Sequence, residues 1–383
     1  MTEQKLTAAG IYIHIPFCRV KCVYCDFYSA ADQNQDLPRF IHALIEEIKR
    51  FDFAPYTKTF DTLFIGGGTP SLIKPAHLEK ILKTLSKKID LSKLTEITLE
   101  ANPGEAPAKK LADFHSLGVN RLSLGVQTLE PTLLKFLTRI HTVEDVFSTF
   151  NFARKAGFEN INCDLIFSIP GQTKTIWKRD LKTIINLGPE HISAYSLTLE
   201  PETKLNKLVK QGKVVMPSSD TDAKMYQITR DILTSNGYEQ YEISNFAQQG
   251  KECRHNLHYW QIDPYVGLGP SAHGFDGKNR YNNVCDLDRY LRIVESGQSP
   301  VENSYIVSEK EMTHDLIGFG LRTVNGLQLN RIAKNHSVQI EKELGRLEKW
   351  KPFILHQNGS LKLTGDGFAF ADAIASDLMV IGQ

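Results

Sequence analysis

Residues 11–25 read IYIHIPFCRVKCVYC, a short apolar run followed at once by three cysteines. The run Ile11–Ile15 is typical of a β-strand. Cys18, Cys22 and Cys25 follow it at C-x₃-C-x₂-C spacing, so three thiolates lie in one loop directly after the strand. This spacing predicts a metal or cluster site that leaves one coordination position open.

The order of strand, polar loop and helix recurs along the chain as far as residue 201. After the first strand we expect strands at 62–70, 96–103, 120–127, 160–171 and 191–201, and helices at 37–51, 75–89, 107–118, 143–157 and 174–188. Such alternation implies a parallel sheet. The strand ends are polar or glycine-rich, as in GGGTP, LEANP and GVQ. A site assembled from many strand ends favours a barrel over an open doubly wound sheet.

The predicted fold class is therefore α/β, an incomplete TIM-like (β/α)₆ barrel in residues 1–215. Residues 216–303 form a mixed connecting region, with a helix expected at 219–237 and the segments CRHNLHYW and GLGPSAHGF. Residues 304–383 predict a small winged-helix-like domain that serves a structural or docking role. Its expected elements are helices at 308–323, 329–337, 339–350 and 366–379, and a hairpin turning at Asn358-Gly359.

Composition excludes several classes of protein. The chain has 383 residues and a net charge of +1, which gives no support to nucleic-acid binding through bulk charge. No apolar run of about 18 residues is present, and the start does not resemble a signal peptide, so we expect a cytoplasmic protein. Disulfides are not expected there. Cys163, Cys253 and Cys285 are interpreted as small buried apolar residues.

The cysteine loop suits an iron–sulfur cluster better than zinc. A structural zinc site is closed by four ligands, for which His14 or Asp26 would have to complete the set. Iron–sulfur clusters are typically held by closely spaced thiolates. A 4Fe–4S cluster on three cysteines keeps one iron open to a small molecule with nitrogen and oxygen donors.

At this point the sequence resembles a known family. YIHIPFCRVKCVYC resembles the cluster loop of the radical S-adenosylmethionine (SAM) superfamily. FIGGGTPS, LEANPG, RLSLGVQ, DLIFSIPGQT, HISAYSLTLEP and GLGPSAHGF resemble its oxygen-independent coproporphyrinogen III oxidase-like branch. Within that branch the chain is most similar to the HemW-type heme chaperones. The resemblance implies that the open iron binds the amino and carboxylate groups of SAM.

The same resemblance assigns the cofactor residues. The cluster is expected on Cys18, Cys22 and Cys25. Residues expected beside the cluster or in contact with SAM are Tyr12, Tyr24, Gly67, Gly68, Thr69, Glu100, Gln127, Arg139 and Asp164. Glycines at the strand end would let the backbone approach the ligand. The motif H-N-x-x-Y-W resembles the heme-associated motif of the chaperone subgroup and comprises His255, Asn256, Tyr259 and Trp260. Cys253, His258 and His273 are the alternative heme contacts.

Two functions stay open at this stage. The oxidases of this branch carry a fourth cysteine where this chain has Phe27, and they have a longer segment before the cluster loop. Both departures favour a heme chaperone over a radical SAM oxidase acting on coproporphyrinogen III. The resemblance further implies heme-accepting partners, such as respiratory enzymes at the membrane, and a homodimer. No residue is singled out as catalytic.

Overall fold

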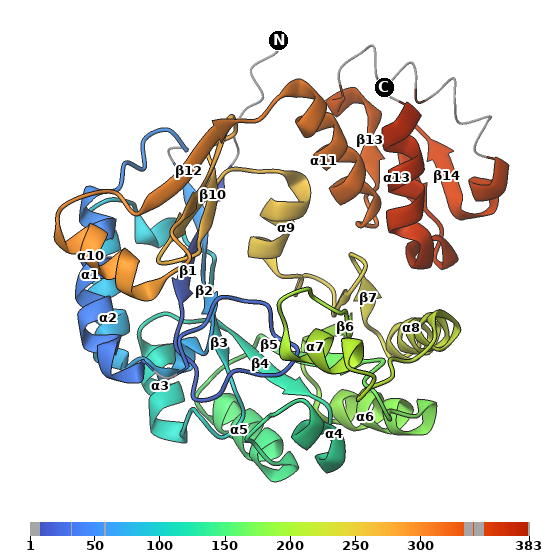
Figure 1. The fold of residues 1–383 in the computed structure, drawn as a ribbon, viewed down its shortest axis with the longest axis horizontal. Helices are drawn as coiled ribbons and strands as arrows, with labels where there is room; N and C mark the ends of the chain where they lie inside the picture. Colours follow the sequence, from blue (N-terminus) through green and yellow to red (C-terminus); the bar gives the residue numbers. More distant parts are fainter. Residues whose placement is uncertain (1–7, 32, 57–58, 333–339, 341–347, 382–383) are drawn as a thin grey trace.

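Six parallel strands in chain order form the centre of the molecule (Figure 1). The computed structural model describes residues 8–31, 33–56, 59–332, 340 and 348–381. The central strands are β1 (Ala9–Ile15), β2 (Phe60–Gly67), β3 (Glu96–Ala101), β4 (Arg121–Gln127), β5 (Ile161–Phe167) and β6 (His191–Ser196). All six coincide with predicted strands, so the incomplete (β/α)₆ barrel is confirmed.

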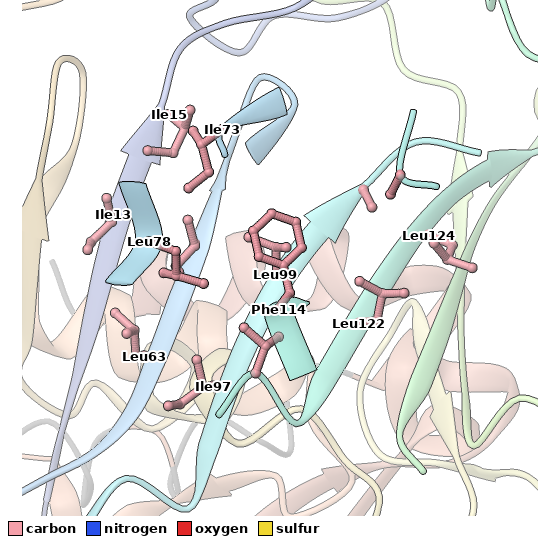
Figure 2. Packing of buried hydrophobic residues seen from close by; sticks show 14 of the residues in the cluster. Ile13, Ile15, Leu63, Ile73, Leu78, Ile97, Leu99, Phe114, Leu122 and Leu124 are labelled. Carbon is pink, nitrogen blue, oxygen red and sulfur yellow. The ribbon is translucent and has the colours of Figure 1, made fainter. Parts of the chain in front are cut away.

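Helices pack against the outer face of these strands. They are α1 (Leu37–Arg50), α2 (Pro75–Leu85), α3 (Ala108–Ser116), α5 (Val143–Lys155), α6 (Lys174–Leu187) and α8 (Ser219–Thr234). Helices α4 (Pro131–Phe136) and α7 (Lys204–Lys210) pack together in a separate apolar cluster. Figure 2 shows Leu78 of α2 and Phe114 of α3 among the strand residues Leu63, Leu99 and Leu122. This apolar layer makes the barrel wall rigid, because burial of each large aliphatic side chain contributes roughly 1.5–3 kcal/mol.

Strand residues of the opposite parity face inward and are polar. Arg121 and Ser123 alternate with Leu122 and Leu124, which belong to the apolar core. Asn162 Nδ2 of β5 donates to Ser123 Oγ at 2.7 Å. Because side chains alternate along a strand, the same sequence builds an apolar exterior and a polar barrel interior.

The connecting region extends the same sheet at both edges. Strands β8 (Asn245–Ala247) and β7 (Glu239–Gln240) follow β6, and β9 (Tyr265–Leu268) pairs in parallel with β1. Beyond β9 lie β10 (His273–Phe275), β11 (Asn279–Asn283) and β12 (Val301–Ile306), which complete a 12-stranded sheet. Helices α9 (Arg254–Gln261) and α10 (Leu287–Glu295) also belong to this region. We did not predict these short elements; the three-region division stays a prediction.

The C-terminal region packs around a core of its own. Its elements are α11 (Glu309–Leu321), β13 (Leu327–Gln328), β14 (Ile354–Gln357), β15 (Ser360–Leu363) and α13 (Ala371–Ile381). The three strands form a separate sheet in the order β13-β15-β14. The predicted hairpin is present, with positive φ at both Asn358 and Gly359. The helices predicted at 329–337 and 339–350 fall largely outside the described residues.

Short 3₁₀ helices complete the fold: Asn34–Asp36, Pro70–Leu72, Leu91–Lys93, Leu329–Arg331, Glu348–Phe353 and Asp366–Phe370. Among the helices that the structure describes, none has the length and apolar character needed to cross a bilayer.

Candidate functional site

The cysteine loop lies at the carboxyl end of β1 and is held by the loop that follows β2. The Gly68 amide donates to Ile15 O at 2.8 Å, and the Thr69 amide donates to Phe17 O at 2.7 Å. A Cβ added to Gly68 would lie 2.6 Å from Phe17 O and 2.9 Å from Cys18 Sγ. Only glycine allows this approach, so the GGGTP loop packs directly on the cysteine loop.

The three thiols are free and partly buried. Burial raises the pKa of Cys18, against a smaller lowering by the Thr69 hydroxyl, and burial raises the pKa of Cys25 to about 12. Bound iron would overcome this cost, because a coordinating thiol is deprotonated outright. The donor set of three thiols in one loop therefore fits an iron–sulfur cluster.

The same loop fits a single metal ion less well. Within the described ranges, no three His, Cys, Asp or Glu side chains converge on one ion-sized position. A cluster requires less convergence, because its thiolates bind different iron atoms. His14 is also committed elsewhere: its Nδ1 lies 3.0 Å from the Tyr12 hydroxyl and its Nε2 lies 2.9 Å from Tyr28 O.

Two side chains predicted from the SAM motifs contact the thiols. Arg139 Nη1 donates to Cys22 Sγ at 3.6 Å, and Thr69 Oγ1 donates to Cys18 Sγ at the same distance. Burial alone would lower the pKa of Arg139, but Tyr24 and Cys22 raise it above its usual value. The guanidinium therefore keeps its positive charge beside the sulfur atoms.

Asn102 belongs to the same cluster of side chains and was not predicted as a site residue. Its Nδ2 donates to Thr69 Oγ1 at 3.0 Å, and its Oδ1 accepts from Arg139 Nη2 at 2.5 Å. Asn102 stands within the motif LEANPG, which the sequence analysis identified. Its role could not be predicted, because its contacts form only where the loops after β1, β2, β3 and β4 meet.

Two half-buried carboxyl groups lie deeper in the barrel. Glu100 Oε2 accepts from the Gly67 amide at 3.1 Å, and Asp164 Oδ2 accepts from Ser123 Oγ at 2.9 Å. Burial, followed by the charge of Asp164, raises the pKa of Glu100 to about 8; burial also raises the pKa of Asp164. Such groups can bind the hydroxyl and amine groups of a polar ligand.

The remaining predicted SAM residues surround these groups. Tyr12 and Glu100 would both lie within 3.2 Å of a Cβ added at Gly66. Gln127 has a φ of 68° at the end of β4, and its Nε2 would meet a Cβ at Gly125 at 3.0 Å. Tyr24 packs among the apolar side chains beneath the cysteine loop. Of the predicted SAM residues, Tyr12 and Asp164 lie midway along β1 and β5, and the others lie at or beyond the carboxyl ends of the strands.

The heme-associated motif lies at the other end of the barrel. It forms α9, whose first amides are capped by a buried carboxylate, with Arg254 N at 2.9 Å from Glu96 Oε2. His255 lies beside Gly10, since a Cβ there would be 2.8 Å from its ring. Figure 1 shows α9 and the cysteine loop toward opposite ends of the sheet.

The motif histidine and the two alternative histidines differ in their exposure and in their hydrogen bonds. His255 is fully buried, with Nδ1 2.9 Å from Thr62 Oγ1 and Nε2 2.8 Å from the Tyr259 hydroxyl. His258 bonds to two carboxylates, and its exposure is 7%. His273 is exposed.

The unassigned cysteines divide into two groups. Cys163 and Cys253 are buried as expected, whereas Cys285 is exposed, so our interpretation of Cys285 was wrong.

The barrel and its cysteine loop define a radical SAM protein, and the comparisons agree: the Radical SAM superfamily model matches residues 12–184. Heme chaperone HemW of Bacillus subtilis is 38% identical over 331 residues, covering 86% of this chain and 87% of that protein. The radical S-adenosyl methionine domain-containing protein 1, mitochondrial, of Bos taurus is 32% identical, covering 97% and 87%. This chain therefore belongs to the HemW family of the radical SAM superfamily.

A solved structure shares the fold across nearly the whole chain. Coproporphyrinogen III oxidase (HemN) of Escherichia coli superposes with a TM-score of 0.82, covering 97% of this chain and 90% of that one. The two sequences are 23% identical, so this likeness describes the fold alone.

Proposed function

We propose that this protein is a heme chaperone that binds a 4Fe–4S cluster, SAM and heme, and transfers heme to acceptor proteins. The observation that carries the proposal is the 38% identity to a heme chaperone over 86% of the chain. The arrangement of the three thiols against the GGGTP loop supports the cofactor part. Phe27 follows the cysteine loop with 64% of its surface exposed, and it offers no fourth thiol.

Cys18, Cys22 and Cys25 would hold the cluster, whose open iron supplies a Lewis-acidic position for SAM. Gly67, Gly68 and Thr69 would let the backbone approach the methionyl end of SAM, because glycine carries no side chain. Glu100 and Asp164 would bind polar groups of SAM deeper in the barrel, with Tyr12, Tyr24, Gln127 and Arg139 around it.

Heme contact is proposed at α9, through His255, Asn256, Tyr259 and Trp260. Ligation of heme iron by His255 requires α9 to move, because both ring nitrogens are hydrogen-bonded and the ring is buried. His273 offers an exposed imidazole without such a movement. Substitution of each histidine can therefore distinguish His255 from His273 as the ligand of the heme iron.

The test begins with anaerobic reconstitution and counting of iron and sulfide. We expect about four irons per chain, and loss of the cluster when any of the three cysteines is replaced by alanine. Heme titration should then give saturable binding. The cysteine variants should retain this binding, because the proposed heme contacts lie on α9. His255→Ala should change the heme absorption spectrum; an unchanged spectrum, together with a changed one for His273→Ala, would move the ligand to His273. Multiple turnovers from coproporphyrinogen III to protoporphyrinogen would refute the chaperone assignment.

The proposal includes partners and location. We place the protein in the cytoplasm, as a homodimer that delivers heme to heme-accepting enzymes, including respiratory enzymes at the membrane. Gel filtration with and without the cluster tests the homodimer. Heme transfer to an apo-enzyme in a purified mixture tests the delivery.

A further inference from the structure

A continuous hydrogen-bonded bridge joins two of the three cysteine sulfurs. From one end, Arg139 Nη1 donates to Cys22 Sγ. From the other, Thr69 Oγ1 donates to Cys18 Sγ. Asn102 lies between them, accepting from Arg139 and donating to Thr69. At each end of the bridge the hydrogen-bond donor is a protein side chain and the acceptor is a cysteine sulfur.

The bridge is fixed from outside as well. Arg139 Nη2 also donates to Gly125 O at 2.7 Å, and Asn102 Nδ2 also donates to Glu105 Oε2 at 2.7 Å. The residue before Arg139, Thr138, accepts from the Val23 amide at 3.0 Å, which holds the same loop against the cysteines. Because each side chain is held at two or more points, the donors are already positioned before any cluster binds.

We propose that Asn102 is a positioning residue for the iron–sulfur site, which orients Arg139 and Thr69 as hydrogen-bond donors to the cluster thiolates and thereby raises the reduction potential of the cluster. The inference rests on the proposed cluster at Cys18, Cys22 and Cys25. Reduction adds negative charge to the cluster. A cation and hydrogen-bond donors at the sulfurs stabilise that charge, and hydrogen bonding to sulfur is one of the factors that set the potentials of such clusters.

The test is a redox titration of the anaerobically reconstituted protein, monitored by electron paramagnetic resonance. Asn102→Ala should shift the midpoint potential to more negative values while the iron and sulfide content stays at the wild-type level. Arg139→Lys should give a smaller negative shift, because it keeps the charge and loses the fork that reaches Cys22, Asn102 and Gly125 together. The matched control is Asn120→Ala. Asn120 also bridges two strands, by accepting from the Ile97 amide and donating to Thr95 O, but it lies at the amino end of β4.

The outcomes separate this inference from the proposed function. If the wild-type protein holds no cluster, the proposed cofactor is wrong and the bridge has no cluster to act on. If the wild-type cluster forms and both Asn102→Ala and Arg139→Lys keep the wild-type potential, the positioning role is refuted while the cluster assignment stands. If Asn102→Ala fails to fold, Asn102→Leu decides: it has nearly the same size, adds no charge and loses both the acceptor for Arg139 and the donor for Thr69, so it too must shift the potential negatively.

Discussion

At the scale of single residues, the most informative pair is Glu100 and Asp164. On its strand, each lies between buried apolar residues, and its own side chain faces the barrel interior. We expect Glu100→Ala and Asp164→Ala to raise the dissociation constant for SAM by roughly tenfold or more, since leaving a polar group of the bound ligand without its partner costs about 1–3 kcal/mol. Isothermal titration on reconstituted protein measures this. Asp113→Ala is the control, because the Asp113 carboxylate forms an exposed ion pair with Lys109 on the surface of α3. Wild-type affinity in both variants would remove these carboxyl groups from the SAM site.

The residue scale also shows where sequence reasoning ends. The glycines and cysteines were predictable because their spacing within one loop is itself the signal. Asn102 was not, since its partners Thr69 and Arg139 come from loops about 33 and 37 residues away. The hydrogen bond between His255 Nδ1 and Thr62 was hidden for the same reason, because Thr62 lies on a distant strand.

At the scale of elements, α9 is anchored at both ends by ionic contacts. Glu96 caps its start, and near its end His258 lies 2.8 Å from Asp61 and 3.1 Å from Asp263. Burial alone would lower the pKa of His258, but hydrogen bonds to Asp263 and Asp61 outweigh it and raise the pKa to about 9. The charged imidazole is therefore part of the folded state at neutral pH.

This predicts a defined pH dependence of stability. A raised folded-state pKa contributes stability that is complete below the unfolded value of 6.5 and is lost as pH rises through about 9. The loss is on the order of 3 kcal/mol at most, at about 1.4 kcal/mol per pKa unit. Urea unfolding at several pH values should show wild-type stability falling across this window relative to His258→Gln. Parallel pH profiles for the two proteins would contradict the assignment.

The hairpin β14–β15 offers a second prediction at this scale. Gly359 has a φ of 71°, and no atom lies within 4 Å of an added Cβ. Gly359→Ala should therefore cost about 1–2 kcal/mol through backbone strain alone. Gly318→Ala in α11 should act in the opposite direction, since its backbone is helical and alanine favours helix by about 1 kcal/mol. The added Cβ would lie 3.3 Å from the end of the flexible Met379 side chain, which can shift to make room. Denaturation midpoints followed by tryptophan fluorescence compare the two. Equal shifts would show that the hairpin does not require the left-handed conformation.

Long helices and strands could be predicted from the sequence, whereas strands of two or three residues could not. The six strand–helix units each span enough residues for the apolar period to be visible, as in α1 with Phe40, Ile41, Leu44 and Ile48 on one side. Strands such as β7, β8 and β10 have two or three residues, which is too few to show alternation. Strand β8 pairs with β6, β7 pairs with β8 and β10 pairs with β9, so their positions are decided by the edges of a sheet that the rest of the chain builds.

At the scale of the whole molecule, the C-terminal region is attached to the barrel through several contacts. The Ile243 amide donates to Arg322 O at 2.9 Å, and the Val324 amide donates to Tyr241 O at 3.1 Å. Trp260, the last residue of the heme-associated motif, packs edge-on against Phe319 of α11 with ring centroids 5.8 Å apart. The motif therefore faces two ways, with His255 inside the barrel and Trp260 against the C-terminal region.

This arrangement predicts that Trp260 stabilises the junction between the two regions. Trp260→Ala should lower the protection of α11 amides against hydrogen exchange, because the partly buried ring contributes roughly 1–3 kcal/mol of apolar contact. Cluster content should not change, since α9 and the cysteine loop lie at opposite ends of the barrel. Val215→Ala is the matched control, as the Val215 side chain is 83% exposed and its truncation removes little contact. If Trp260→Ala instead leaves α11 protection intact and lowers heme affinity, its ring acts on the porphyrin and the junction is held by the backbone hydrogen bonds at Ile243 and Val324.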